Sequence, residues 1–168
     1  TFTANVGDSI AVWVGEVTTG SSLLPWLRIY GPNGAPLGND FNASAAEVTV
    51  RATNSGTFLV VVGDGNTGFG GVGNYRLSLA KTGNAPTISP SDEGGPLING
   101  TSYLATIDTG DVDAWTLIAN AGESIVVRAG EITAETLYPW VRLFGPNGAL
   151  LSEDFNQAAA EVNFPGTN

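Results

Sequence analysis

The side chains of this chain that could do chemistry are almost all carboxylates and amides. Its 168 residues include 16 Asp and Glu against six Lys and Arg, with no Cys and no His. Without imidazole or thiol groups, Ser-His-Asp and Cys-His catalysis, disulfides and Cys-ligated metals are excluded. The oxygen ligands that remain suit hard cations such as calcium. The formal net charge of −10 argues against binding to nucleic acid or to anionic lipid surfaces.

Two segments concentrate these oxygen ligands. One short loop contains the three carboxylates of Asp108, Asp111 and Asp113. A glycine-rich segment begins with Asp64 and Asn66. Neither segment has the spacing of an EF-hand, and Asp, Asn and Gly are also ordinary turn residues. Calcium is therefore the one cofactor that the sequence suggests, with turn formation as the structural alternative.

Three carboxylates occur at matching positions of an internal repeat: Glu16 and Glu131, Asp40 and Asp154, Glu47 and Glu161. A glycosidase would hold two carboxylates across a cleft. The structural interpretation, in which these charges cap turns or pair with Arg28 and Arg142, is favoured because the chain has no His or Cys to assist catalysis. The sequence therefore predicts a protein that is not an enzyme.

An aromatic–Arg–aromatic stripe also occurs twice, as Trp26, Arg28 and Tyr30 and as Trp140, Arg142 and Phe144. Residues two apart on a strand share one face. If exposed, this face could stack on sugar rings or seat a neighbouring domain, because aromatic residues and Arg dominate binding hot spots. The alternative, which is favoured, is a cation–π layer inside the domain.

These positions must be held by strands, because apolar and polar residues alternate with a period of two. Ile10, Val12 and Val14 alternate with smaller or polar residues, and Phe58 to Val62 forms an apolar run predicted to be buried on both faces. The 23 Gly and nine Pro supply turns such as Gly31-Pro32-Asn33-Gly34. The sequence thus predicts an all-β antiparallel sandwich, with a short helical turn possible only at Ala43 to Val50. No stretch is apolar for the roughly 18 residues of a membrane span.

The repeat itself has a period of about 114 residues. Pro25 to Ala35 returns as Pro139 to Ala149, with Ile/Val/Leu and Tyr/Phe exchanges in register. A period of this length indicates tandem domains rather than a solenoid, whose repeats run roughly 20–50 residues. We predict a first copy over residues 1–82, a Pro/Gly-rich linker over 83–100 and a second copy over 101–168, which would open with strands at Tyr103 to Ile107 and Trp115 to Ile118.

The two copies overlap only in part. Thr1 aligns with Thr116 and Asn168 with Asn54, so the first copy lacks a counterpart of 101–115 and the second lacks one of 55–81. A sandwich without these strands has unpaired edges and an open core. We therefore expect a neighbouring copy to complete each sandwich by chain continuation or by donated strands.

The ordered set of motifs resembles the bacterial pre-peptidase C-terminal domain. The resemblance is carried by Gly110-Asp111-Val112-Asp113-Ala114-Trp115, by Gly122-Glu123-Ser124-Ile125, by the Gly-Pro-Asn-Gly turn, and by Ser55 to Val62 closed by Gly73 to Leu79. It implies a jelly-roll-like sandwich of secreted bacterial proteins, which is appended to proteases without being their catalytic part or strung along surface proteins. Some relatives bind collagen, polysaccharide or calcium. The family's Asp-rich strand before the turn is replaced here by Trp26 to Tyr30, so a ligand role of those aspartates does not carry over.

The function predicted from these features is a structural repeat of a secreted, extracellular tandem-domain protein. Its partners would be copies of itself in a filament at the bacterial cell surface, with adhesion to surface polysaccharide or protein as a further role. The alternative is a carbohydrate- or protein-binding accessory module of a secreted hydrolase. No nucleic acid and no membrane span are expected.

Overall fold

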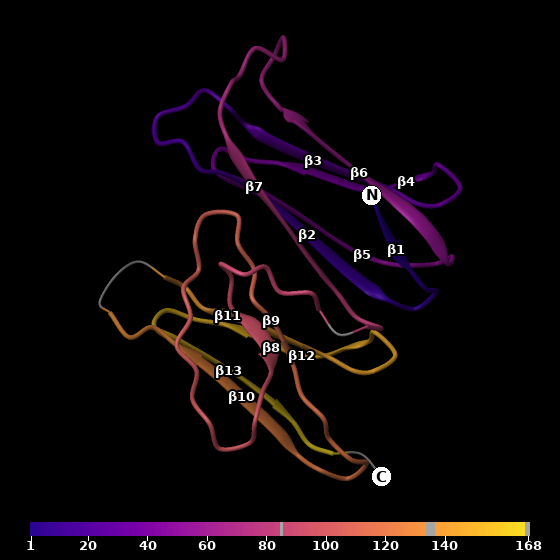
Figure 1. The fold of residues 1–168 in the computed structure, drawn as a ribbon, viewed down its shortest axis with the longest axis vertical. Helices are drawn as coiled ribbons and strands as arrows, with labels where there is room; N and C mark the ends of the chain where they lie inside the picture. The colour runs from indigo at the N-terminus through magenta and orange to yellow at the C-terminus, as the bar shows by residue number, and fades with distance from the viewer. Residues whose placement is uncertain (85, 134–136, 167–168) are drawn as a thin grey trace. The chain divides into compact units, whose positions relative to one another are not determined.

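The computed structural model describes residues 1–84, 86–133 and 137–166 and is all-β (Figure 1). None of these residues forms a helix, so none of the described segments is a helix that could cross a membrane. The chain divides into two compact units, Thr1–Thr116 and Leu117–Asn168. The boundaries predicted at 82/83 and 100/101 both fall inside the first unit, which therefore includes the segment predicted as a linker.

The first unit is built from two antiparallel sheets and one short parallel pair. The larger sheet has the order β1-β6-β3-β4, the second has the order β5-β2-β7, and β8 pairs with β9. The strands are β1 (Phe2–Ala4), β2 (Ser9–Glu16), β3 (Pro25–Tyr30), β4 (Pro36–Phe41), β5 (Ala45–Arg51), β6 (Gly56–Asp64), β7 (Tyr75–Lys81), β8 (Gly94–Pro96) and β9 (Ala114–Thr116). The antiparallel all-β prediction is thereby confirmed.

The core of the first unit lies between these two sheets. Ile10, Val12 and Val14 of β2 are at most 1% exposed, and they pack with Leu27 and Ile29 of the opposite sheet. The predicted alternation is therefore correct for β2, because one face of the strand meets the core and the other does not.

β6 differs from its prediction. Phe58 is buried and stacks on Phe2 with ring centroids 5.4 Å apart, but the next residue, Leu59, is 45% exposed. An apolar run had predicted burial on both faces, and this was wrong. β6 lies inside its sheet between β1 and β3, yet only one face of that sheet meets the core.

Two further predictions about elements were wrong. Ala43 to Val50 contributes to β5 rather than to a helical turn, because β5 pairs with β2 over seven residues from Ser9↔Arg51 to Gly15↔Ala45. Tyr103 to Ile107 forms no strand, and of the strand predicted at Trp115 to Ile118 only Trp115 and Thr116 are paired, as part of β9. The Tyr103 ring instead packs at a tilt against the Trp115 ring, with ring centroids 5.0 Å apart.

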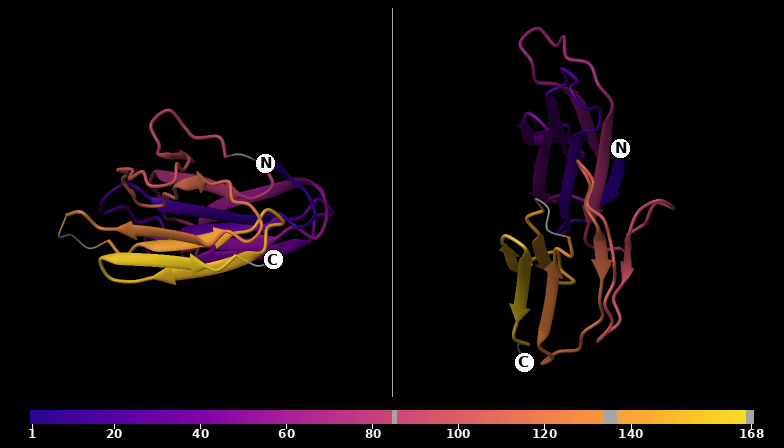
Figure 2. Two further views of the ribbon diagram at one scale, coloured as in Figure 1. Left: turned by 90° about the horizontal axis from the view of Figure 1, so that it is seen from below. Right: turned by 90° about the vertical axis from the view of Figure 1, so that its left-hand side faces the viewer.

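The described residues of the second unit form four strands in two antiparallel pairs, the consecutive strands β11 and β12, and β10 with β13, which flank them in the chain. They are β10 (Ile125–Gly130), β11 (Trp140–Phe144), β12 (Leu150–Phe155) and β13 (Ala159–Phe164). Figure 2 shows β10 and β13 side by side. The pairs use the registers of the first unit: Trp140↔Phe155 matches Trp26↔Phe41.

A tight turn connects β3 to β4, and an equivalent turn connects β11 to β12, as predicted. Gly34 donates its N–H to the Gly31 carbonyl at 2.9 Å, and Gly148 donates to Gly145 at the same distance. Both Gly34 and Gly148 have a φ of 77°, a conformation that glycine adopts at no steric cost. The turn residues therefore set the register of both strand pairs.

Candidate functional site

The Asp108–Asp113 segment, called the acidic loop below, lies on the outer face of the sheet β5-β2-β7. Its Gly110 approaches the backbone of Gly15 in β2, and the hydroxyl of Ser78 in β7 donates to the Gly110 carbonyl at 3.0 Å. Gly15 and Ser78 belong to the row of residues that points away from the core. The loop is thus positioned by two neighbouring strands of one sheet.

Arg76 of β7 forms ion pairs with two carboxylates of the acidic loop. Its Nη2 donates to Asp108 at 2.8 Å and its Nη1 donates to Asp111 at 3.0 Å. The hydrogen bond to Asp108 and the negative charges of Asp111 and Asp108 raise the pKa of the Arg76 guanidinium. The Asp111 side chain is only 5% exposed, so its charge depends on this partner.

A cluster of three carboxylates lies beside this clamp. Asp92, Asp111 and Asp113 each offer one oxygen, and these oxygens lie within 4.8 Å of one another. The Oδ1 atom of Asp113 is buried and has no hydrogen-bond partner among the described residues. Burial, followed by the charges of Asp111, Glu93 and Asp92, raises the pKa of the Asp113 carboxyl to about 7. Such a carboxyl can hold a proton or share a cation with its neighbours near neutral pH.

The cluster differs in one member from the predicted calcium ligands. Asp111 and Asp113 come together, but Asp108 turns to Arg76, and Asp92 takes the third position. Asp92 was missed because Ser91-Asp92-Glu93 lies in a stretch whose Pro and Gly residues indicated a linker. Two adjacent carboxylates in that stretch were the available signal. The parallel pairing of β8 with β9 brings the two segments together.

The other predicted calcium segment organises a loop. Asp64 accepts hydrogen bonds from the backbone N–H groups of Leu24 at 3.0 Å and Gly71 at 2.6 Å, and from the Asn66 side chain at 2.8 Å. Although burial raises its pKa, the N–H groups of Leu24, Gly71 and Asn66 outweigh that effect and lower it. Both oxygens of Asp64 face N–H donors, which is the arrangement of a loop anchor rather than of a cation site.

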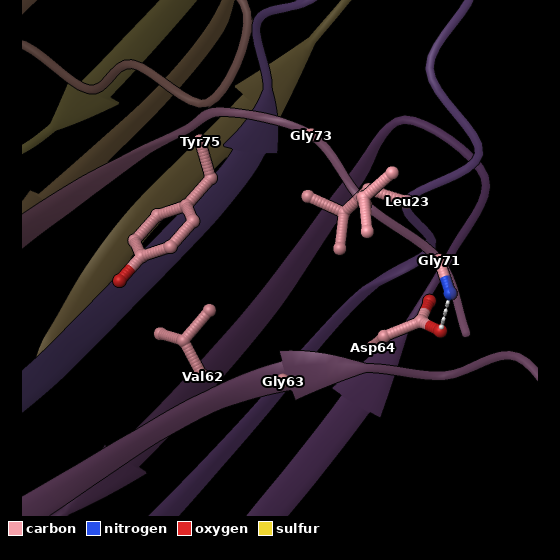
Figure 3. Close-up of a pocket in the computed structure, with 8 residues that line it drawn as sticks. Leu23, Val62, Gly63, Asp64, Gly71, Gly73 and Tyr75 are labelled. Carbon is pink, nitrogen blue, oxygen red and sulfur yellow. Dashed lines mark hydrogen bonds between the residues drawn. The ribbon is translucent and has the colours of Figure 1, made fainter. Parts of the chain in front are cut away.

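A cleft of about 320 Å³ lies next to this anchor, between β6 and the residues that lead into β7. Figure 3 shows Val62, Leu23 and Tyr75 on its sides, with the N–H of Gly71 bound to Asp64. The Asp64 oxygens are already engaged by N–H donors, so the walls of the cleft are mainly apolar. On β7, Leu77 and Leu79 belong to the row that faces the core side, yet both side chains are more than 40% exposed.

The aromatic–Arg stripe forms on β3 as the spacing predicts. The Arg28 guanidinium lies 4.4 Å from the centre of the Trp26 ring and 6.0 Å from that of Tyr30, and it donates to the Tyr30 hydroxyl at 3.1 Å. All three side chains are half-buried on the outward face. Trp26 lies over Gly63 of β6, where a Cβ would come within 3.0 Å of the ring.

The corresponding stripe of the second unit is more open. The Arg142 guanidinium lies 4.0 Å from the centre of the Trp140 ring, but Trp140 is 48% exposed. Among the described residues, β11 has no neighbour on the side where β3 pairs with β6. The stripe is therefore a stacked layer in both units, and only the second presents its Trp ring to solvent.

Among the recurring carboxylates, Asp40 and Asp154 lie near the ends of β4 and β12, whereas Glu47 and Glu161 lie within β5 and β13. Asp40 accepts the N–H of Glu47, and Asp154 accepts the N–H of Glu161, both at 2.9 Å. Glu161 also pairs with Arg128. Glu16 has one buried oxygen without a partner among the described residues, while Glu131 accepts the N–H of Leu137 at 3.2 Å. Asp40 and Asp154 thus have the turn-capping role that the structural interpretation gave them.

No protein-family model, curated protein or solved structure matches this chain.

Proposed function

We propose that this chain is a non-enzymatic structural repeat of a secreted bacterial tandem-domain protein, in which neighbouring copies complete one another's sandwiches and build an extracellular or cell-surface fibre. Secretion and the jelly-roll-like topology follow from the resemblance to the pre-peptidase C-terminal domain. The internal repeat supports the tandem arrangement.

The observation that carries the proposal is a difference in burial between equivalent residues. Ile10, Val12 and Val14 of β2 are fully buried, whereas Ile125 and Val127, the equivalents of the first two in β10, are only half-buried. Partly uncovered β-branched residues forgo part of the roughly 25 cal/mol per Å² that apolar burial contributes. The second unit therefore has apolar residues at core positions, but none of its described strands covers them fully.

The strand partners explain the difference. In the first unit β2 pairs with β7 and β3 pairs with β6, but among the described residues β10 and β11 have no partner on those sides. An open edge of this kind is a template for a further strand. A copy of β6 and β7 would fill both edges in the registers that the first unit already uses.

The test is to lengthen the chain in register. Asn168 aligns with Asn54, so a second copy of Ser55–Lys81 is joined after Asn168. We expect the amides of Ile125 to Gly130 to become strongly protected from hydrogen exchange and the second unit to melt at a higher temperature. The matched control carries Val60→Asp and Val62→Asp in the added copy, which places charges on the core-facing row of β6. Equal protection with and without the added strands would overturn the proposal.

The cofactor in this proposal is a calcium ion at Asp92, Asp111 and Asp113. The unpartnered Asp113 oxygen and the raised pKa of its carboxyl support it, because a divalent cation would relieve the repulsion among the three carboxylates. Calcium is expected to raise the melting temperature relative to a chelator, and Asp113→Asn to remove this increase. An identical melting temperature with calcium and with chelator would refute the calcium site.

The exposed Trp140 supports one second candidate, a module that binds polysaccharide or protein. An exposed Trp stacked on Arg offers an apolar face of the kind that sugar rings pack against. Affinity electrophoresis in polysaccharide gels would show retardation that Trp140→Ala abolishes and Phe69→Ala, a change at an exposed aromatic of the first unit, preserves. Unretarded migration of the unchanged chain in every gel would dismiss this candidate for polysaccharides.

A further inference from the structure

The acidic loop meets β2 at two glycines that pack backbone against backbone. A Cβ added to Gly15 would overlap the backbone of Gly110 and come within 2.7 Å of the Thr109 carbonyl carbon. Gly110 has a φ of 75°, so the loop turns where it crosses the strand. Glycine at position 15 is therefore required by the loop that lies on it.

The loop is held at this crossing by two side chains of β7. Ser78 binds the carbonyl of Gly110, and Arg76 binds the carboxylates of Asp108 and Asp111. The docking site of the loop, called the seat below, thus consists of Gly15 on β2 and of the Ser78 hydroxyl and the Arg76 guanidinium on β7. The acidic loop and the residues that bind it all lie in the first unit, so this contact fastens the last segment of that unit to its sheet.

The second copy has the same glycine without the loop. Gly15-Glu16-Val17-Thr18 aligns with Gly130-Glu131-Ile132-Thr133. Among the described residues, a Cβ on Gly130 would meet only Ala158 and Ala159, at 3.8 and 3.9 Å, which is ordinary van der Waals contact. The backbone of Gly130 also needs no left-handed conformation. Glycine in a strand interior is less stable than alanine, and none of the described contacts of Gly130 offsets this cost.

We infer that Gly130 is the docking seat for the acidic loop of a following copy of this chain, placed as Gly110 lies on Gly15. The inference rests on the proposed function, because the Arg and Ser of the seat come from the β7-like strand of that copy. It adds a specific contact to strand completion: a glycine pair and an Arg–Asp clamp that fasten the added loop to β10 and to the added β7-like strand.

The test compares one substitution at two equivalent positions in two chains. In the 168-residue chain, Gly15→Ala is expected to speed the exchange of the Asp111 amide, which donates to Asp108 within the loop, while Gly130→Ala leaves the exchange pattern unchanged. In a chain lengthened after Asn168 by a second copy of Ser55–Thr116, Gly130→Ala is expected to speed the exchange of the added loop. Arg76→Ala in the added copy should release the same loop while β10 stays protected.

Two results separate the inference from the proposed function. If β10 is protected in the lengthened chain but neither Gly130→Ala nor the added Arg76→Ala changes the exchange of the added loop, the docking seat is refuted and strand completion stands. If the added strands do not protect β10, strand completion and the docking seat are both refuted.

Discussion

At the scale of single residues, several charged side chains of the first unit have structural partners. Arg76 neutralises two carboxylates of the acidic loop, and Asp64 gathers the N–H groups of a glycine-rich loop. Lys81 pairs with the buried Asp8 at 3.3 Å. In a chain with 16 acidic and six basic residues, each cation that contacts a carboxylate decides where a loop can be attached.

Removing the Arg76 guanidinium should detach the acidic loop. Arg76→Ala leaves the nearly buried Asp111 without its cation, and the melting temperature of the first unit should fall by several degrees. Arg76→Lys should lose less, because an ammonium group keeps the charge but not the two-pronged contact. Thermal unfolding of the three chains measures this order. A melting temperature of Arg76→Ala equal to that of the unchanged chain would show that the clamp is not needed.

The Asp64 anchor should respond to acid. The pKa of Asp64 is lowered in the folded chain, so its stabilising contribution is complete above its ordinary value of 3.8 and is lost as pH falls through the lowered value. Amide exchange of Leu24 and Gly71 should therefore rise sharply in that acidic range. Asp64→Asn should show faster exchange of both amides already at neutral pH. An exchange rate of Gly71 that follows only the intrinsic pH dependence would contradict this role.

At the scale of elements, β6 has one face that packs in the core and one face that is in contact with water. In β6, Phe58 packs on Phe2 in the core, and its neighbour Leu59 points outward. The pleat of a strand alternates these environments at every residue. Neighbouring apolar residues of similar size thus contribute different amounts to the free energy of unfolding.

Substitutions at Phe58 and Leu59 therefore compare a core-facing residue with an outward-facing residue of the same strand. Phe58→Ala should lower the free energy of unfolding of the first unit by about 3–5 kcal/mol, because it opens a cavity in the core. Leu59→Ala should cost less than about 1 kcal/mol, because the side chain is already in contact with water. Denaturant unfolding followed by Trp fluorescence measures both values. Similar losses for the two variants would contradict the assigned faces of β6.

At the scale of the whole molecule, the two units should differ in stability. The first encloses its core between two sheets, whereas the second exposes core positions of β10. Strands without partners and with few buried contacts open most readily. Completion by a neighbouring copy would then be a source of stability as well as a means of assembly.

Hydrogen exchange of the 168-residue chain should show this difference directly. The amides of Ile10, Val12 and Val14 are expected to exchange only on global unfolding of the first unit, and those of Ile125 and Val127 by local opening at much higher rates. The comparison is internal, since the residues are equivalent in the repeat. Equal protection of β2 and β10 would argue that the second unit needs no partner.

The sequence by itself determined the all-β class, the alternation of β2, the tight turns and the correspondence between β2 to β5 and β10 to β13. These signals are local, because a pleated strand turns alternate side chains to one face and a tight turn is made by four consecutive residues. Only the tertiary structure decided that Asp92 joins Asp111 and Asp113, that Gly15 meets Gly110, and that Leu59 faces solvent. These features depend on which distant segments come together and on which face of a sheet is covered. The spacing of nearby residues predicts neither of these.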